Sequence, residues 1–509
     1  MSDSARPPVT AAGPAPLGFK GARRRVERGI EHVLEWADDQ FEISRGLRKM
    51  LDHIFPDHWS FMLGEIALYC FVVLVLTGVF LALYFDPSHQ DKVYWGSYAP
   101  LRSQHVSAAY ASTVDISFSV RNGLLFRQMH HWAADIFIFV IVVHMCRVFF
   151  TGAFRKPRAT NWVIGATMLF LAIINGYAGY SLPDDLMSGT GLRIGYSIIE
   201  SMPLIGSYLA VFLFGGQFPG DGRIEYRLFI AHVFIIPALI AVLLAVHLSL
   251  IYKQKHTQFA QPGRTELNTV GSPMFPRYML KSIGLFALVT GVLSILAGLA
   301  QVNPIWQFGH YEPYMVSYAS QPDWYMGWIE GAMRIMPFWE WEGFGHTAVF
   351  VIFLPAVVLP VVTYLVLAAW PLIESRMTKD RTQHHLLQRP RENPVRTSIG
   401  VGILVFYAVL FFAASDDLIA NFFDVPLESV VWGLRICTVV LPFVVGYPVH
   451  RICVDLRRER GTGGEVVLAD DHYLLEPDPP PEEHELEPEP VPTIVLPGPV
   501  TVTVPAADG

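Results

Sequence analysis

Eight long apolar segments alternate with polar connections along the chain. Each segment is long enough, at about 1.5 Å per residue, to cross a hydrocarbon core of about 30 Å as a helix. The pattern therefore predicts an all-α fold, a polytopic membrane protein with eight transmembrane helices. The expected helices lie roughly at residues 61–85, 124–150, 162–182, 227–252, 280–303, 346–370, 398–415 and 430–454.

Composition and charge agree with a membrane protein and add an orientation. The 509 residues are 52% hydrophobic and 16% charged, and an acidic tail dominates the net charge of −8. Every second connection is basic, as the positive-inside rule requires of the cytoplasmic side, so we expect both termini in the cytoplasm of a bacterial cell. The basic connections are those before the first expected helix, after the last, and at 151–161, 253–279 and 371–397.

The ends of the chain differ from the apolar middle. Residues 20–55 mix apolar and charged positions, which favours an interfacial helix. Residues 476–509 are rich in Pro and Glu and are expected to be disordered. We therefore divide the chain into a cytoplasmic segment (1–60), a four-helix bundle (61–255), a second transmembrane half (278–455) and a cytoplasmic tail (456–509).

Four histidines lie on two of the expected helices. His130 and His144 are 14 residues apart, and His232 and His247 are 15 apart. Each pair spans about 21–22 Å along a helix, with members near opposite surfaces. Membrane histidines are expensive and suggest function, although a single one is more often a hydrogen-bonded packing residue. Two helices offering histidines at matched depths predict two bis-histidine haems. His131 points about 100° away from His130 and is not expected to be a ligand.

Glycines and arginines accompany these histidines. Gly64 and Gly78 are 14 residues apart, as are Gly165 and Gly179. Glycine permits close approach to a helix backbone, so this repeat suggests that both helices pack against porphyrins. Arg127 lies three residues before His130, and Arg147 lies three residues after His144. At the membrane surface each arginine either pairs with haem propionates or is a snorkelling residue at a helix end. No C-x-x-C-H motif occurs, so any haem is held non-covalently, and the four cysteines are interpreted as packing residues.

A further motif lies in the connection between the fifth and sixth expected helices. It reads Gln321-Pro322-Asp323-Trp324-Tyr325. A carboxylate beside aromatic residues at a membrane surface suits proton acceptance from a quinol hydroxyl. The alternative is a surface loop with aromatic-belt residues, and the residues alone leave both open.

These motifs together resemble cytochrome b of the cytochrome bc complexes. The resemblance covers about residues 20–455 and rests on QMH130, VVH144MCR, IAH232, AVH247L, the glycine pairs, GYSLP (179–183) and PDWY (322–325). The family has PEWY where this chain has Asp323. The unsplit chain, the long polar tail and PDWY are similar to the actinobacterial, menaquinol-oxidising form.

The resemblance implies a quinol:cytochrome c reductase with two haem b groups. Menaquinol is oxidised at an outer site formed by Pro322, Asp323, Trp324 and Tyr325 and by the segment around Gly191, with Asp323 and Tyr325 as catalytic residues. One electron passes to a Rieske iron–sulfur subunit and a c-type cytochrome subunit. The other passes through the outer haem (His130, His232) and the inner haem (His144, His247) to a quinone, while protons are translocated. For the inner quinone site the expected residues are Tyr252, Lys253 and Ser282.

The resemblance also implies that the protein assembles as a dimer in the cell membrane and joins a supercomplex with a terminal oxidase. It implies no binding to nucleic acid.

Two alternative functions compete with this interpretation. A haem-bearing membrane anchor of a dehydrogenase would lack PDWY and the second transmembrane half. A transporter with histidines in its pathway would be colourless, whereas bis-histidine haems give b-type absorption bands.

Overall fold

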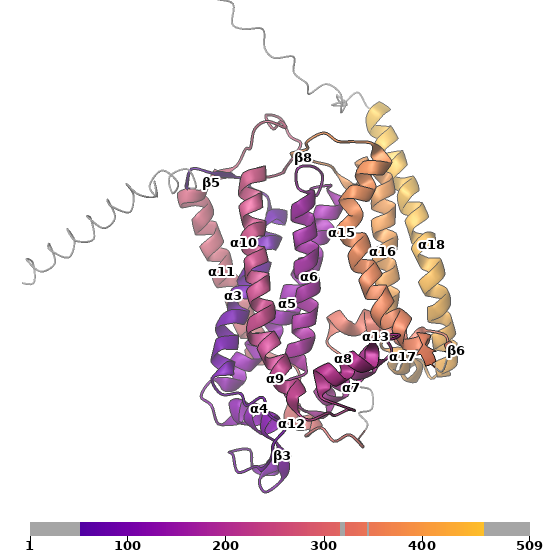
Figure 1. Cartoon of the computed structure of the whole chain (residues 1–509). Coiled ribbons are helices and arrows are strands. Elements are labelled where there is room, and N and C mark those ends of the chain that lie inside the picture. The colour runs from indigo at the N-terminus through magenta and orange to yellow at the C-terminus, as the bar shows by residue number, and fades with distance from the viewer. Residues whose placement is uncertain (1–50, 316–320, 344–345, 463–509) are drawn as a thin grey trace, which may run out of the picture.

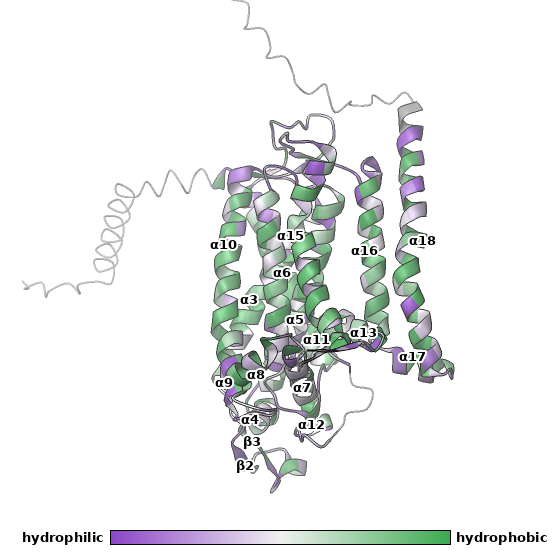
Figure 2. Ribbon diagram, turned by 45° about the vertical axis from the view of Figure 1, so that its right-hand side comes forward, coloured by the Kyte–Doolittle hydropathy of each residue, from purple (hydrophilic) through white to green (hydrophobic). Residues whose placement is uncertain are grey.

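The computed structural model describes residues 51–315, 321–343 and 346–462, and its dominant feature is a set of long, nearly parallel helices. Eight of them are long and apolar enough to cross a membrane, which confirms the predicted fold class. The spans are Trp59–Ala82, Gly123–Phe150, Ala159–Tyr180, Arg223–Gln254, Met274–Leu299, Phe350–Thr378, Pro394–Ala413 and Leu427–Glu459. Figure 2 shows the apolar residues along the middle of these helices and hydrophilic ones toward their ends.

The spans are built from the following elements. The first half contains η1 (Trp59–Phe61), α3 (Met62–Ala82), α5 (Gly123–Phe150), α6 (Ala159–Tyr180), α9 (Arg223–Ile230), η3 (Ala231–Ile235) and α10 (Ile236–Gln254). The second contains η4 (Met274–Tyr278), α11 (Met279–Leu299), α14 (Phe350–Phe353), η6 (Leu354–Val358), α15 (Leu359–Thr378), α16 (Pro394–Ala413) and α18 (Leu427–Thr462).

Short elements fill the connections. The helical ones are η2 (Ala99–Leu101), α4 (Ala108–Phe118), α7 (Leu186–Glu200), α8 (Gly206–Phe214), α12 (Ile305–Phe308), η5 (Trp324–Met326), α13 (Gly327–Ile335), η7 (Pro390–Glu392) and α17 (Asp416–Phe423). The strands form pairs: β1 (Ile54–Phe55) with β5 (Ser272–Pro273), β2 (Asp91–Val93) with β3 (His105–Ser107), β4 (Gln258–Phe259) with β8 (Leu386–Leu387), and β6 (Glu340–Gly343) with β7 (His346–Val349).

The basic connections meet at one end of the bundle. Arg158, just before α6, donates to the carbonyl oxygens of Lys255 and His384 at 3.0 and 2.6 Å. The described chain also begins and ends at this end, where β5, β8 and the last turns of α18 lie (Figure 1). The helices α4, α7, α8, α13 and α17 lie at the opposite end. We call these the basic end and the opposite end.

The two halves of the chain pack along α6 and α15. The Trp162 indole donates to the carbonyl oxygen of Leu367 at 2.6 Å, and the hydroxyls of Thr167 and Tyr364 lie 3.0 Å apart. Within the first half, α3 packs along α5, and Cys70, Val73 and Ala133 form part of their shared core. The helices that carry the four histidines are therefore held by neighbours on either side.

Several helix boundaries differ from the prediction, and the structure gives a physical reason at both ends of the sixth expected helix. The predicted 346–370 helix begins only at Phe350, because Glu340–Gly343 and His346–Val349 form a hairpin. It continues to Thr378, since the carboxylate of Glu374 is paired with Arg396 at 2.7 Å and its charge is not left exposed to lipid. The last helix runs to Thr462 instead of 454. The expected interfacial helix falls almost wholly on residues 1–50 and the Pro/Glu-rich tail on 463–509, outside the described residues.

Candidate functional site

The first pair of histidines meets near the opposite end, between α5 and the start of the α10 span. The ring centroids of His130 and His232 lie 6.0 Å apart. Two metal–imidazole bonds of about 2 Å each, plus the ring radii, give a separation of this size. The Nδ1 of His130 lies 3.0 Å from the Thr77 hydroxyl, and that of His232 lies 2.9 Å from the carbonyl oxygen of Asn175. A carbonyl accepts only, so it fixes the proton of His232 on Nδ1 and leaves Nε2 free as a metal ligand.

The second pair lies near the basic end on the same two helices. The Nδ1 atoms of His144 and His247 are buried without a hydrogen-bond partner. His144 lies on α5 and His247 on α10. The two pairs therefore lie on the same two spans at two depths, as two stacked haems require.

Each histidine faces one of the predicted glycines on a neighbouring helix. A Cβ added at Gly64 would lie 3.4 Å from the ring of His144, and one at Gly78 would lie 3.2 Å from the ring of His130. On α6, Gly165 faces His247 with more room, at 3.8 Å, whereas a Cβ at Gly179 would collide with the ring of His232. The structure thus brings together all eight residues that the spacing singled out. Their arrangement fits a flat group against each imidazole.

The two predicted arginines are largely enclosed at the ends of α5. Arg127 donates to the carbonyl oxygen of Asn303 at 3.1 Å and stacks over Trp306, while its Nε has no partner. Arg147 lies over the Phe61 ring at 4.3 Å, and its Nε and one Nη are buried without partners. Buried guanidinium donors without acceptors fit the carboxylates of a bound group such as haem propionates.

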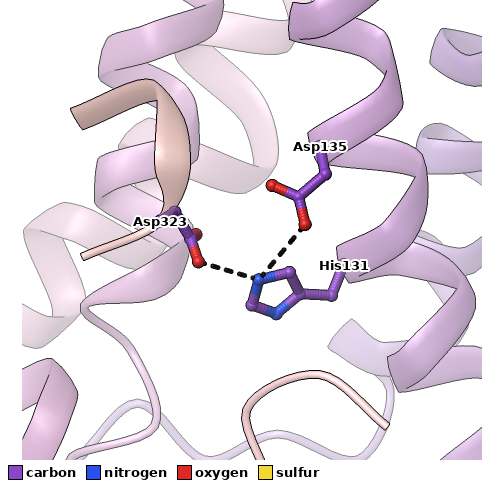
Figure 3. Close-up of side chains that lie close together, drawn as sticks. All are labelled: His131, Asp135 and Asp323. Atoms are coloured by element: carbon purple, nitrogen blue, oxygen red, sulfur yellow. Dashed lines mark hydrogen bonds and ion pairs between the residues drawn. The ribbon is translucent and has the colours of Figure 1, made fainter. Parts of the chain in front are cut away.

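Asp323 of the PDWY motif lies against α5. The Tyr325 hydroxyl donates to Oδ2 of Asp323 at 3.0 Å. Nε2 of His131 lies 3.1 Å from Oδ1 of the same carboxylate (Figure 3). Burial, and then the nearby Asp323 carboxylate, raise the pKa of Tyr325 well above its usual value. Tyr325 therefore remains a neutral hydrogen-bond donor. Pro322 and Trp324 flank Asp323, and the Trp324 ring packs near Phe139 of α5.

His131 and Asp135 are the residues that sequence reasoning missed here. The carboxylate of Asp135 lies 3.9 Å from Nε2 of His131, and with Asp323 the three ligand-type atoms lie within 4.8 Å of one another (Figure 3). The sequence signal was available, because His131 and Asp135 are polar residues four apart in an apolar helix and so share a face. The angular offset of about 100° from His130 excludes His131 as a haem ligand but says nothing against a contact with another residue.

Gly191 lies in α7, away from the Asp323 contacts just described but close to the end of α6. Its carbonyl oxygen accepts from the Tyr177 hydroxyl at 3.1 Å, and a Cβ added there would lie 3.3 Å from the Tyr180 ring. Both tyrosines belong to α6, whose Gly176 lies directly against the Tyr325 ring. The segment around Gly191 is thus linked to the PDWY motif through α6.

A cavity of about 260 Å³ opens at the basic end between the start of α3 and the start of α11. Ser282 lines it, but Tyr252 and Lys253 do not. Tyr252 packs against His53, with ring centroids 4.7 Å apart, and Lys253 is exposed. Of the three expected inner-site residues, the structure brings only Ser282 to the cavity.

Comparisons with known proteins agree with this architecture. Residues 135–310 match the family model described as cytochrome b(N-terminal)/b6/petB. The chain is 47% identical over 458 residues to the cytochrome bc1 complex cytochrome b subunit of Streptomyces coelicolor, covering 90% of this chain and 82% of that one. It is 51% identical over 422 residues to the protein of that name from Mycobacterium tuberculosis, covering 83% and 76%.

A solved structure described as a hyperthermophilic respiratory Complex III shares the fold. The TM-score is 0.61 at 19% sequence identity, and the superposition covers 82% of this chain and 99% of that one. At this identity the likeness concerns the fold alone. The identities near 50% over most of the chain decide the family: the chain belongs to the cytochrome b subunits of the cytochrome bc1 complex.

Proposed function

We propose that this chain is the dihaem subunit of a menaquinol:cytochrome c oxidoreductase in the bacterial cell membrane. His130 and His232 hold one haem b, and His144 and His247 hold the other. When bound, the haems supply one-electron carriers at two depths of the membrane. The observation that carries the proposal is the match of four histidines with four glycines, each histidine facing a glycine of a neighbouring helix.

The chain's own residues prepare these sites. Thr77 and the carbonyl oxygen of Asn175 orient the outer pair of imidazoles through Nδ1. The glycines leave room for a flat ring, and Arg127 and Arg147 offer unpaired donors to its carboxylates. His130, His232, His144 and His247 would hold the two haems with histidine ligands only, and a haem held in this way would supply electron transfer and not oxygen binding.

The outer quinol site is centred on Asp323. Its carboxylate accepts a proton from the quinol hydroxyl, and Tyr325 holds the carboxylate in place through the bond to Oδ2. Asp323 lies at the end where the connections are poor in Lys and Arg, which is the side of proton release under the positive-inside rule. Both termini are then cytoplasmic. The inner quinone site is the cavity lined by Ser282.

The proposal extends to partners. The cytochrome bc1 name of the relatives supports a Rieske iron–sulfur subunit and a c-type cytochrome subunit as partners of this chain. We also propose a dimer and a supercomplex with a terminal oxidase.

Haem content tests the proposal most directly. The His144→Ala variant is expected to lose the inner haem and keep the outer one, since each haem needs both of its ligands. His131→Ala is the matched control on the same helix and is expected to keep both. Two haems in His144→Ala, measured by extraction and by reduced-minus-oxidised spectra, would refute the ligand assignment. Extraction of the quinone that copurifies with the complex tests the assignment of menaquinol as substrate.

A further inference from the structure

A carboxyl group inside the first membrane span has no role in the sites described so far. Glu65 lies one turn into α3, and its neighbour Gly64 faces His144. Ionisable residues in membrane helices are costly and mark function by default. Glu65 also lines the 260 Å³ cavity at the basic end, together with Ser282, Tyr278 and Lys281.

The side chain of Glu65 is surrounded by hydroxyl groups from two elements besides its own helix. The Ser282 hydroxyl of α11 donates to Oε2 at 2.8 Å, and the Tyr69 hydroxyl of α3 donates to the same oxygen at 3.3 Å. Tyr278 of η4 donates to Oε1. The side chains that hydrogen-bond Glu65 among the described residues are thus all neutral. A hydroxyl group can donate to a carboxylate or accept from a carboxylic acid, so both forms of this group have hydrogen-bond partners here.

The lysine that lines the cavity is paired with a different carboxylate. Lys281, beside Ser282, lies 2.6 Å from Oδ1 of Asp57, and Ser272 donates to Oδ2 of Asp57 at 2.5 Å. The Lys281 and Ser272 bonds hold the pKa of Asp57 below its usual value. Asp57 and Lys281 are 44% and 55% exposed, so this pair marks the solvent end of the cavity. Glu65 lies at the end nearer the membrane interior.

The cavity lies beside the inner histidine pair. Phe61, which also lines it, carries the Arg147 guanidinium over its ring, and Arg147 follows His144 by one helical turn. A molecule in the cavity therefore contacts Glu65 on one side and lies next to the inner haem site on the other.

We propose that Glu65 is the acid that protonates a quinone at this inner site. The inference rests on the proposed inner quinone site and names its proton donor. In the step, the carboxyl O–H bond breaks and an O–H bond forms on the nearer quinone oxygen. The second proton comes from water at the mouth of the cavity, and the two electrons come from quinol oxidised by the complex. Glu65 then regains a proton from the cytoplasm past Asp57 and Lys281.

The experiment uses the intact purified complex with its b haems reduced, mixed anaerobically with 2,3-dimethyl-1,4-naphthoquinone. Glu65→Gln is expected to slow haem reoxidation at least about tenfold, within the usual range for general acid catalysis. Haem content and absorption bands are expected to stay unchanged. The matched control is Asp52→Asn, which removes an exposed carboxylate just before β1 that does not line the cavity, and it is expected to react at the wild-type rate.

A pH series separates proton delivery from mere packing. The reoxidation rates of wild type and Glu65→Gln are compared across the pH series: loss of a proton donor is expected to change the pH profile of the rate, whereas loss of a merely packing side chain is expected to leave that profile unchanged. The other titratable groups around the cavity are Asp57, His58, Tyr69, Tyr278 and Lys281, and all remain in the variant. In infrared difference spectra, quinone reduction is expected to change a carboxyl C=O band that is absent in Glu65→Gln and shifted in Glu65→Asp.

The outcomes distinguish the two levels of the proposal. If wild-type haem, fully present, is not reoxidised by the naphthoquinone, the inner quinone site itself is wrong. If wild type reacts and Glu65→Gln matches it at every pH, only the role of Glu65 is refuted. If Glu65→Gln does not assemble, Glu65→Asp decides, because an unshifted carboxyl band and an unchanged pH profile in that variant would overturn the proposal.

Discussion

Gly179 provides the sharpest structural test of the haem cradle. A Cβ at this position would lie 2.8 Å from both Nδ1 and Nε2 of His232, and closer still to the carbon between them. Ordinary contact begins at 3.4 Å, and the closest ring atom, the carbon Cε1, sets the shift, so in Gly179→Ala the ring must move by about 1 Å. Metal–ligand distances tolerate only about 0.2 Å. The movement also strains the bond from His232 to the carbonyl oxygen of Asn175, which contributes about 0.5–1.5 kcal/mol.

Gly165→Ala is the matched control on the same helix. Its Cβ would meet the ring of His247 at 3.8 Å, which is ordinary contact. We therefore expect Gly179→Ala to lose the outer haem and Gly165→Ala to keep both haems. The assay is haem per polypeptide in the purified complex, together with the reduced spectrum. Full occupancy in Gly179→Ala with an unchanged spectrum would show that the glycine does not limit the approach of the porphyrin or the ring.

Three further predictions concern single carboxyl groups. Asp323→Asn is expected to slow quinol-dependent haem reduction at least about tenfold in pre-steady-state measurements at matched haem content, with Asp323→Glu much milder; equal rates in all three proteins would remove Asp323 from catalysis. Glu374→Ala removes the carboxylate that pairs with the buried Arg396 and is expected to lower the free energy of unfolding by about 3–5 kcal/mol. The control Asp455→Ala breaks an exposed pair with Arg458 and is expected to cost less than about 1 kcal/mol, so similar losses in the two variants would contradict the prediction. Burial raises the pKa of Asp185 from 3.8 to about 6, so the folded state binds the proton more tightly and stability is expected to fall as pH rises through that window. Asp185→Asn is expected to flatten this slope in thermal unfolding, and an unchanged slope would assign it to other groups.

The sequence predicted what depends on periodicity and long apolar runs. Eight spans follow from length and hydropathy, and the 14- and 15-residue spacings placed His130, His144, His232 and His247 at two depths. The glycine repeat predicted only that two helices pack against the porphyrins; the structure adds that each histidine faces one of these glycines. These features can be predicted because helix geometry converts the spacing of residues in the sequence directly into their position along the helix.

What the sequence did not predict depends on contacts between distant segments. Nothing in the spacing places Ser282 of α11 against Glu65 of α3, because that contact depends on how the two helices pack. The same holds for Tyr252, which was expected at the inner site but packs against His53 outside the cavity lining. Helix boundaries at 350 and 378 depended likewise on a hairpin and a buried ion pair.

The position of His131 links the two proposed functions of α5. His130 and His131 are adjacent, so their side chains leave the helix about 100° apart: one faces His232 and the other faces Asp323. A movement of this turn of α5 that shifts the outer haem ligand therefore also shifts the partner of the Asp323 carboxylate. Substitutions at Asp323 are best compared only at matched haem content for this reason. A variant that lost haem when Asp323 was replaced would report on the turn that holds His130 and not on proton transfer.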